Sequence, residues 1–319
     1  MITVVIPVYN RETTLPSTLA SIDAQTRRPD RVILVDNAST DSSLSIITEW
    51  ASTRPYVTVV SESRPGAAAA RNRGLREVDT EWTMFFDSDD LMHPNHVADF
   101  ADGIAAHPDC DLLGRDIYVE LPDRGTVMGY FMARVSPMLW NLWRGSLATQ
   151  RYIARTELFR SVGGWDETDF GWDDIELGVR LIIAGARMAK LPGSPSVTTR
   201  YQEQSITGTL KSNHPERWEH TLETIRGRVE ALPPDHSSRR RWLFLVDLRS
   251  ILLAAIYRRE AAVADTCVER ERREALANAL YKKVRGVTDY PLTVGFIYRY
   301  FDRIVHVSRP MLRLFRHIF

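Results

Sequence analysis

The first ninety residues alternate between short apolar runs and segments of helical length, and this alternation constrains the fold more than any other feature. Four runs rich in Val, Ile, Phe and Thr each close on a polar or turn-forming residue: ITVVIPVY, DRVILVD, YVTVVSE and EWTMFFD. Short, continuously apolar runs of this kind predict strands that are buried on both faces. Helices are expected between them, so the pattern predicts an α/β fold with a mostly parallel sheet flanked by helices.

Polar residues follow these runs where each predicted strand ends. Ligands of such sheets bind at the carboxyl ends of the strands, where Tyr9 and Asp36 lie. Three acids, Asp87, Asp89 and Asp90, are crowded into four positions behind the fourth run. Their mutual repulsion favours a bound cation, although a solvated acidic turn before the next helix would use the same residues. The pattern therefore predicts a ligand site at this edge of the sheet.

The net charge of zero conceals two differently charged regions. Residues 1–210 hold 20 Lys and Arg against 28 Asp and Glu, and residues 211–319 hold 21 against 13. Strand-and-turn patterning gives way to helical patterning at the same boundary. We therefore expect an α/β domain over 1–210 and a helical C-terminal region over 211–319.

Cysteine content and hydropathy indicate the compartment. Cys110 and Cys267 are too few for a disulfide framework and are not spaced as a zinc site. The chain enters a strand-like run at once, without the pattern of a signal peptide. Its most apolar segment, residues 242–257, carries Asp247 and Arg249. These features predict a cytoplasmic protein, free or peripheral at the inner face of the membrane.

Five blocks, in this order and at these spacings, resemble the family-2 glycosyltransferases of the GT-A fold: VVIPVYNRETTLPSTLASIDAQT, VILVDNASTDSS, RPGAAAARNRGL, FFDSDD and GGWDETDFGWDDIELGVRL. The resemblance covers roughly residues 1–207. It implies a nucleotide-sugar donor, a divalent metal, and transfer with inversion at the anomeric carbon. The expected acceptor is a hydroxyl of a glycan or lipid-linked molecule in cell-surface polysaccharide synthesis.

The acid group resembles the DXD motif of this family. The resemblance implies that a hard cation, Mn²⁺ or Mg²⁺, bridges the diphosphate of the donor, and carboxylates are suitable ligands for such ions. We assign the three acids as a set, with Asp89 and Asp90 favoured for the metal and Asp87 for the nucleotide.

The upstream blocks resemble the nucleoside pocket. They would give an aromatic face and a polar edge to a uracil or thymine, with UDP as the expected nucleotide. The residues implied are Pro7, Tyr9, Asn10, Asp36 and Asn37. The common family pattern has an acid at the last position, where Asn37 can offer a donor or an acceptor. Arg71 could reach phosphate or hold the nucleotide loop, although arginines on a helix surface are usually solvated.

The block WDDIELGVRL resembles the acidic pair that opens a helix in this family. Inversion requires a base that takes the proton of the attacking hydroxyl, and Asp174 is the expected base. Asp173 would bind acceptor hydroxyls or orient its neighbour, and Trp165 and Trp172 would offer apolar faces to a sugar. A helix N-terminus keeps such carboxylates ionised, but it also explains them without catalysis.

Two segments depart from the family pattern or extend beyond it. Many relatives place a metal-binding histidine where residues 201–205 carry only Gln202 and Gln204 as candidates, and His214 is the nearest histidine downstream. Fewer protein ligands, or His214, would then hold the metal. Residues 299–319 alternate arginines with apolar residues, which suits an anionic membrane surface, a partner subunit or the protein's own core.

Other functions fit the sequence less well. A nucleotidyltransferase would need a glycine-rich phosphate loop with a lysine after the first strand, and a dinucleotide oxidoreductase would need G-x-G-x-x-G. The sequence contains neither. A nucleotide-sugar-binding protein without transfer activity stays as the alternative to an enzyme. No nucleic acid is expected as a partner.

Overall fold

The computed structural model describes residues 1–121, 125–131, 136–201 and 210–288, together with residues 293, 295 and 298. The chain forms two compact units, Met1–Glu203 and Gln204–Phe319, which we call unit 1 and unit 2. Residues 299–319, Gln202 and Gln204, on which parts of the sequence analysis depend, lie outside the described residues.

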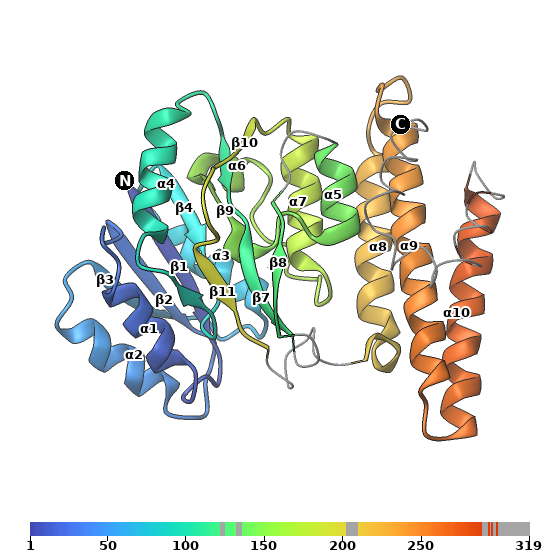
Figure 1. The fold of residues 1–319 in the computed structure, drawn as a ribbon, viewed down its shortest axis with the longest axis horizontal. Coiled ribbons are helices and arrows are strands. Elements are labelled where there is room, and N and C mark those ends of the chain that lie inside the picture. Colours follow the sequence, from blue (N-terminus) through green and yellow to red (C-terminus); the bar gives the residue numbers. More distant parts are fainter. Residues whose placement is uncertain are drawn as a thin grey trace. The chain divides into compact units, whose positions relative to one another are not determined.

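The first half of unit 1 confirms the predicted alternation of strands and helices. Its elements are β1 (Ile2–Val8), α1 (Leu15–Asp23), β2 (Arg31–Asp36), α2 (Ser43–Ser52), β3 (Val57–Ser61), α3 (Ala67–Glu77) and β4 (Trp82–Phe85). Strand β1 pairs in parallel with β2 and β4, and β2 pairs in parallel with β3. The carboxyl ends of these strands therefore meet at one edge of the sheet (Figure 1).

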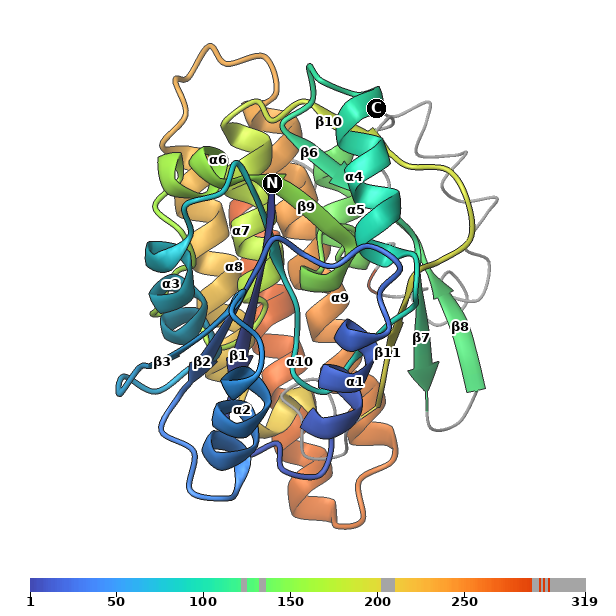
Figure 2. The same ribbon diagram turned by 90° about the vertical axis from the view of Figure 1, so that its left-hand side faces the viewer.

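The second half of unit 1 completes this sheet and adds a smaller one. It contains β5 (Leu91–Met92), α4 (His96–Ala106), β6 (Leu112–Gly114), β7 (Ile117–Leu121), β8 (Gly125–Gly129), α5 (Pro137–Arg144), η1 (Thr149–Arg151), β9 (Tyr152–Arg155), α6 (Thr156–Ser161), α7 (Asp173–Ile183), β10 (Met188–Lys190) and β11 (Val197–Thr199). The seven-stranded sheet has the order β10-β6-β9-β4-β1-β2-β3. The second sheet has the order β5-β11-β7-β8, and Figure 2 shows its strands β11, β7 and β8.

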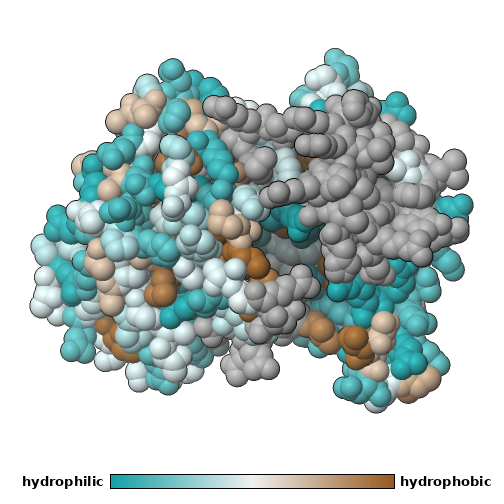
Figure 3. Space-filling model, in the orientation of Figure 1, coloured by the Kyte–Doolittle hydropathy of each residue, from teal (hydrophilic) through white to brown (hydrophobic). Residues whose placement is uncertain are grey.

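Two apolar cores cover the two faces of the large sheet. One receives side chains from α1, α2 and α4, such as Leu19, Ile47 and Phe100. The other receives side chains from α3, α6 and α7, such as Leu75 and Leu177. On the face drawn in Figure 3, the apolar residues of unit 1 form small groups among hydrophilic ones. Burial of both sheet faces explains why the strands are almost continuously apolar.

Unit 2 is helical, as the sequence predicts for the C-terminal region. It contains η2 (Lys211–Asn213), α8 (Pro215–Glu230), α9 (Arg239–Ala262) and α10 (Cys267–Val287). Helix α9 buries Asp247, which forms an ion pair with Arg226 of α8. Among the described residues, no helix combines the length and the apolar character needed to cross a membrane.

Candidate active site

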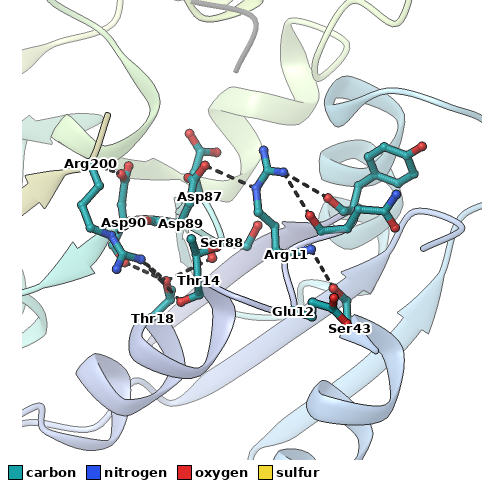
Figure 4. Close-up of polar contacts among 12 residues, drawn as sticks. Arg11, Glu12, Thr14, Thr18, Ser43, Asp87, Ser88, Asp89, Asp90 and Arg200 are labelled. Carbon is teal, nitrogen blue, oxygen red and sulfur yellow. Dashed lines mark hydrogen bonds and ion pairs between the residues drawn. The ribbon is translucent and has the colours of Figure 1, made fainter. Parts of the chain in front are cut away.

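The acid loop, residues 87–90, follows β4 at the carboxyl edge of the sheet. Thr18 of α1 donates its hydroxyl to the carbonyl oxygens of Ser88 and Asp90, at 3.1 and 2.9 Å. The backbone nitrogen of Arg200 donates to Asp90 Oδ1 at 2.9 Å. Arg11 and Arg200 approach the loop from different sides in Figure 4. The loop is therefore fixed by elements far apart in sequence.

The three acids of the loop have different surroundings. Asp90 is buried and accepts a hydrogen bond from Gln150 Nε2 at 2.6 Å. Gln150 also donates to Asp87, whose other carboxylate oxygen accepts from Arg71 at 2.8 Å. Asp89 is partly exposed and pairs with Arg11, with 3.3 Å between Arg11 Nε and Asp89 Oδ2. Each carboxylate is thus balanced by donors from another part of the chain.

These donors do not fully offset the clustering of negative charge. Burial, and then the charge of Asp87, raises the pKa of the Asp89 carboxyl. Burial and both neighbouring acids raise the pKa of Asp90 well above its usual range. Added positive charge would therefore stabilise the ionised loop.

The donor chemistry of the loop fits Mn²⁺ or Mg²⁺. Both ions accept carboxylate oxygens, and Mg²⁺ is usually held by one or two carboxylates together with water and substrate phosphates. In the part of the chain that the structure describes, no three His, Cys, Asp or Glu side chains are grouped closely enough to hold a metal by themselves. Asp89 and Asp90 could supply two carboxylate ligands to such an ion. His214 lies in unit 2, 3.4 Å from Glu216.

The residues assigned to a nucleoside lie at the ends of β1 and β2. Tyr9 is 55% exposed, so its ring is available for stacking. Asn10 has a φ of 49°, a left-handed conformation that asparagine tolerates, and its Oδ1 accepts from the nitrogen of Thr40 at 2.8 Å. Pro7, the second-last residue of strand β1, is half-buried. The hydrogen bond between Asn10 and Thr40 links the segments that follow β1 and β2.

Asp36 and Asn37 are more buried than the rest of this group. Both carboxylate oxygens of Asp36 accept from the nitrogen of Ser39, at 3.4 Å. The Asn37 amide donates to the carbonyl oxygens of Glu62 and Arg64 and accepts from the nitrogen of Gly66. Asn37 thereby holds the segment that leads into α3, and its contact with a base stays a prediction.

Arg71 is buried, unlike most arginines on a helix. Its Nη2 donates to Asp87 Oδ1 and its Nη1 to Asp173 Oδ2, each at 2.8 Å. The guanidinium also lies over the Trp165 ring, 4.3 Å from the ring centre. Burial lowers the pKa of Arg71, but the charges of Asp87 and Asp173 outweigh this and raise it. Arg71 is therefore a fixed cation of the site.

Asp173 and Asp174 open α7, as the sequence predicts, and both are half-buried. Asp174 donates its backbone nitrogen to Asp173 Oδ1 at 3.0 Å. Burial, and then the charge of Asp173, raises the pKa of Asp174 to about 7. Burial also raises the pKa of Asp173, although Arg71 opposes it. Burial therefore opposes the helix N-terminus, which is expected from the sequence to favour the ionised form of Asp174.

The two tryptophans assigned to the acceptor are both buried. Trp165 is 2% exposed and packs edge-on against Phe85 of β4, with 5.2 Å between the ring centres. Trp172 is 7% exposed and precedes α7. Trp165 thus acts as a core residue beneath Arg71. Contact of either ring with an acceptor sugar stays a prediction.

Sequence reasoning missed Arg11, Gln150 and Arg200, which contact the acid loop. Gln150 lies in η1 immediately before β9, and β9 runs antiparallel to β4. That pairing brings Gln150 into contact with Asp87, from which it is separated by 63 positions in the sequence. No local pattern could reveal it, because it depends on the register of two strands that are distant in sequence.

Sequence comparison finds similarity to known glycosyltransferases. A profile described as glycosyl transferase family 2 matches residues 3–162. An uncharacterized glycosyltransferase of Haemophilus influenzae is 25% identical over 187 residues, which are 57% of this chain and 62% of the relative. The validoxylamine A glucosyltransferase of Streptomyces hygroscopicus subsp. limoneus is 27% identical over 230 residues, covering 59% and 49%. The chain thus spans less than two thirds of the length of these relatives.

Solved structures share the fold. Residues 1–349 of S. aureus TarS superpose with a TM-score of 0.69 at 18% identity, covering 93% of this chain and 86% of that one. TarS was also solved in complex with UDP-GlcNAc. The mannosyltransferase PcManGT of Pyrobaculum calidifontis, in complex with GDP-Man and Mn²⁺, gives a TM-score of 0.57 at 23% identity, covering 94% and 87%. With its GT-A type of fold and the match over residues 3–162, the chain belongs to glycosyl transferase family 2.

Proposed function

We propose that this protein is a metal-dependent inverting glycosyltransferase. It moves a sugar from a nucleoside diphosphate donor, UDP-linked in the first instance, to a hydroxyl of a glycan or lipid-linked acceptor during cell-surface polysaccharide synthesis. The observation that carries the proposal is the pairing of two acidic groups, the acid loop and the Asp173–Asp174 pair, through the single side chain of Arg71. One group suits a diphosphate with its cation, and the other suits an attacking hydroxyl.

The donor side is supported by the strand ends and by the neighbours. TarS and PcManGT, which share the fold, bind UDP-GlcNAc and GDP-Man respectively. In this chain, the exposed Tyr9 would stack on the base. The polar edges and the phosphate side would come from the remaining residues of the group: Pro7, Asn10, Asp36, Asn37, Arg71 and Asp87.

Asp89 and Asp90 would hold the divalent cation. When bound, Mn²⁺ or Mg²⁺ offsets the negative charge of the departing diphosphate. The chain itself prepares the loop for this role. Thr18 holds the backbone of the loop, and the backbone nitrogen of Arg200 holds the Asp90 carboxylate. These bonds keep the acids clustered despite their mutual repulsion.

Asp174 would act as the base on the acceptor side. It takes the proton of the acceptor hydroxyl as the oxygen attacks the anomeric carbon, opposite the bond to the diphosphate that breaks. A pKa of about 7 matches this task, because general bases work best when their pKa lies near the working pH. Asp173 accepts the backbone nitrogen of Asp174 and would orient it or bind acceptor hydroxyls. Trp165 and Trp172 form the apolar surroundings of the proposed acceptor side.

Calorimetry with UDP, GDP, CDP and dTDP, with and without Mn²⁺, tests the donor side. We expect UDP to bind in the presence of Mn²⁺ and to bind much more weakly with chelator. Hydrolysis of a panel of nucleotide sugars then tests turnover and identifies the sugar. Binding without hydrolysis or transfer would favour the alternative, a nucleotide-sugar-binding protein. Failure of every nucleotide to bind would contradict the proposal.

We further propose that residues 299–319, outside the described part of the chain, bring a cytoplasmic enzyme to the anionic inner face of the membrane. Residues 211–319 carry 21 Lys and Arg against 13 Asp and Glu. Each basic residue near an anionic surface contributes about 1 kcal/mol. Sedimentation with phosphatidylserine vesicles at low salt should depend on residues 299–319. No sedimentation of the full chain would instead favour packing within the protein or an oligomer.

A further inference from the structure

Arg71 joins two parts of the site that come from distant parts of the chain. Asp87 follows β4 on the donor side, and Asp173 begins α7 on the acceptor side, 102 positions from Arg71. Arg71 donates to each of them at 2.8 Å through a different nitrogen. One planar side chain therefore spans the donor-side loop and the acceptor-side pair.

The guanidinium is held in a single orientation by its surroundings. Arg71 is 6% exposed, and its guanidinium carbon lies 4.3 Å from the centre of the Trp165 ring. Trp165 in turn packs against Phe85 of β4. A guanidinium is planar and presents its donors in a rigid fork, so stacking on a buried ring fixes the direction of both hydrogen bonds.

Asp173 transmits this constraint to Asp174. One oxygen of Asp173 accepts from Arg71, and the other accepts from the backbone nitrogen of Asp174 at 3.0 Å. Both carboxylate oxygens are engaged, so the side chain cannot rotate without losing a bond. The first turn of α7 is thus tied to α3 through Arg71.

We propose that Arg71 is a positioning residue. It fixes the position of the Asp173–Asp174 pair relative to the acid loop and keeps a positive charge beside the proposed base. The inference rests on the proposed function for the role of Asp174. This role adds to the place of Arg71 on the nucleotide side and rests on its two hydrogen bonds within the protein, to Asp87 and Asp173.

The charges around Asp174 support this assignment. They are Asp173 on the same helix, Arg71 of α3 and Arg151 of η1, and the Tyr152 hydroxyl of β9 is buried beside them. Burial and Asp173 raise the pKa of Asp174, whereas the hydrogen bond from the Ile175 nitrogen, and then Arg71 and Arg151, lower it. Without the charge of Arg71, the Ile175 hydrogen bond and Arg151 would be left to oppose the rise.

The pH dependence of transfer tests the proposal. In Arg71→Met, the rising limb of kcat against pH should move to higher pH by about one unit or more, because a nearby opposite charge is typically worth 1–3 pKa units. Arg71→Lys retains a charge but not the fork. In Arg71→Lys, the rising limb of kcat against pH should stay near its wild-type position, while the maximum kcat falls. Arg73→Met, on the same helix and paired with Glu77, is the matched control and should change neither property.

A second measurement needs no activity. NMR titration of ¹³C-labelled aspartate carboxyls, with the Asp174 signal assigned by its loss in Asp174→Asn, should show a higher Asp174 pKa in Arg71→Met and little change in Arg71→Lys. An unchanged Asp174 titration would overturn the inference. The inference would also be overturned if Arg71→Met lost only its affinity for UDP with Mn²⁺ and kept the wild-type Asp174 titration and kcat. If Asp174→Asn kept full transfer activity, the proposed base would be wrong, while the titration would still decide the role of Arg71.

Discussion

Arg11 places its Nε 3.3 Å from Asp89 Oδ2, so a guanidinium from the loop after β1 already pairs with a carboxylate assigned to the metal (Figure 4). Both side chains are partly exposed, at 35% and 16%. Arg11 and a divalent cation would therefore act on the same carboxylate. The partners of Asp90 are different, because its two carboxylate oxygens accept from Gln150 and from the backbone nitrogen of Arg200.

Asp89→Asn should weaken UDP binding only when Mn²⁺ or Mg²⁺ is present. The amide keeps the size of the side chain but loses the negative charge that would hold the cation. Asp89 is a cleaner probe than Asp90, because the Asp90 carboxylate also fixes the loop. Calorimetry in Mn²⁺ and in chelator measures the difference. Equal losses in both conditions would show that Asp89 does not act through a metal.

Arg11→Gln should tighten the binding of Mn²⁺ measured by electron paramagnetic resonance. Removing a neighbouring cation relieves a repulsion of about 0.5–1 kcal/mol at a solvent-accessible site, or roughly two- to fivefold in affinity. Arg54→Gln is the matched control, since Arg54 forms a surface ion pair with Asp23 at 2.7 Å. Weaker Mn²⁺ binding in Arg11→Gln would mean that Arg11 shapes the loop instead of competing with the cation.

Asp174→Asn should retain donor binding but lose transfer by about two to four orders of magnitude, the range expected for removal of a general base. The amide cannot accept the proton of the hydroxyl. Steady-state rates with saturating donor, together with UDP affinity, separate the two effects. Near-normal transfer would move the role of base to Asp173.

Local signals in the sequence predicted the elements that carry the site. The four apolar runs form β1 to β4, and α7 begins at Asp173. These features depend on residues within one segment, where side-chain periodicity and helix-start preferences act.

The partners of the acids could not be predicted in the same way. Gln150 meets Asp87 across 63 positions, and Arg200 meets Asp90 across 110. Such contacts depend on how β9 and β11 are placed by pairing with distant strands. The raised pKa of Asp174 was missed for a related reason, because burial comes from packing that a helix-start pattern does not reveal.

Gly74→Ala should destabilise unit 1. A Cβ at Gly74 would lie 2.3 Å from Val5 Cγ1 and 3.1 Å from Val35 Cγ2, and both valines belong to central strands. Overpacking of this kind costs about 1–3 kcal/mol, which outweighs the gain of roughly 1 kcal/mol in helix propensity. Urea denaturation followed by circular dichroism measures the change.

Gly227→Ala in α8 is the matched control for this prediction. A Cβ there meets nothing within 4 Å among the described residues, so only the gain in helix propensity remains. We expect stabilisation by up to about 1 kcal/mol. Equal effects of the two substitutions would show that α3 can shift away from the sheet.

The proposed base should make the protein less stable as the pH rises. The folded-state pKa of Asp174 is about 7, above the value of about 3.9 for an unfolded aspartate. Between these values the folded state binds more protons than the unfolded state, so the free energy of unfolding falls as the pH rises from about 4 to 7. Asp174→Asn stays neutral throughout and should be more stable than the wild type at pH 8, by on the order of 1–3 kcal/mol. The two should converge at pH 4.

Asp111→Asn gives the opposite sign and serves as the control. The hydrogen bond from Arg187 lowers the pKa of Asp111, so its contribution to stability is present at neutral pH and is lost as the pH falls through the folded-state pKa. This variant should therefore be less stable than the wild type at pH 7 and approach it in acid. Thermal unfolding of the three proteins from pH 4 to 8 measures both trends. If the thermal stability of the wild type and of Asp174→Asn changed in parallel with pH, Asp174 would ionise in the folded protein as it does in water. The physical basis for its tuning as a base would then be lost.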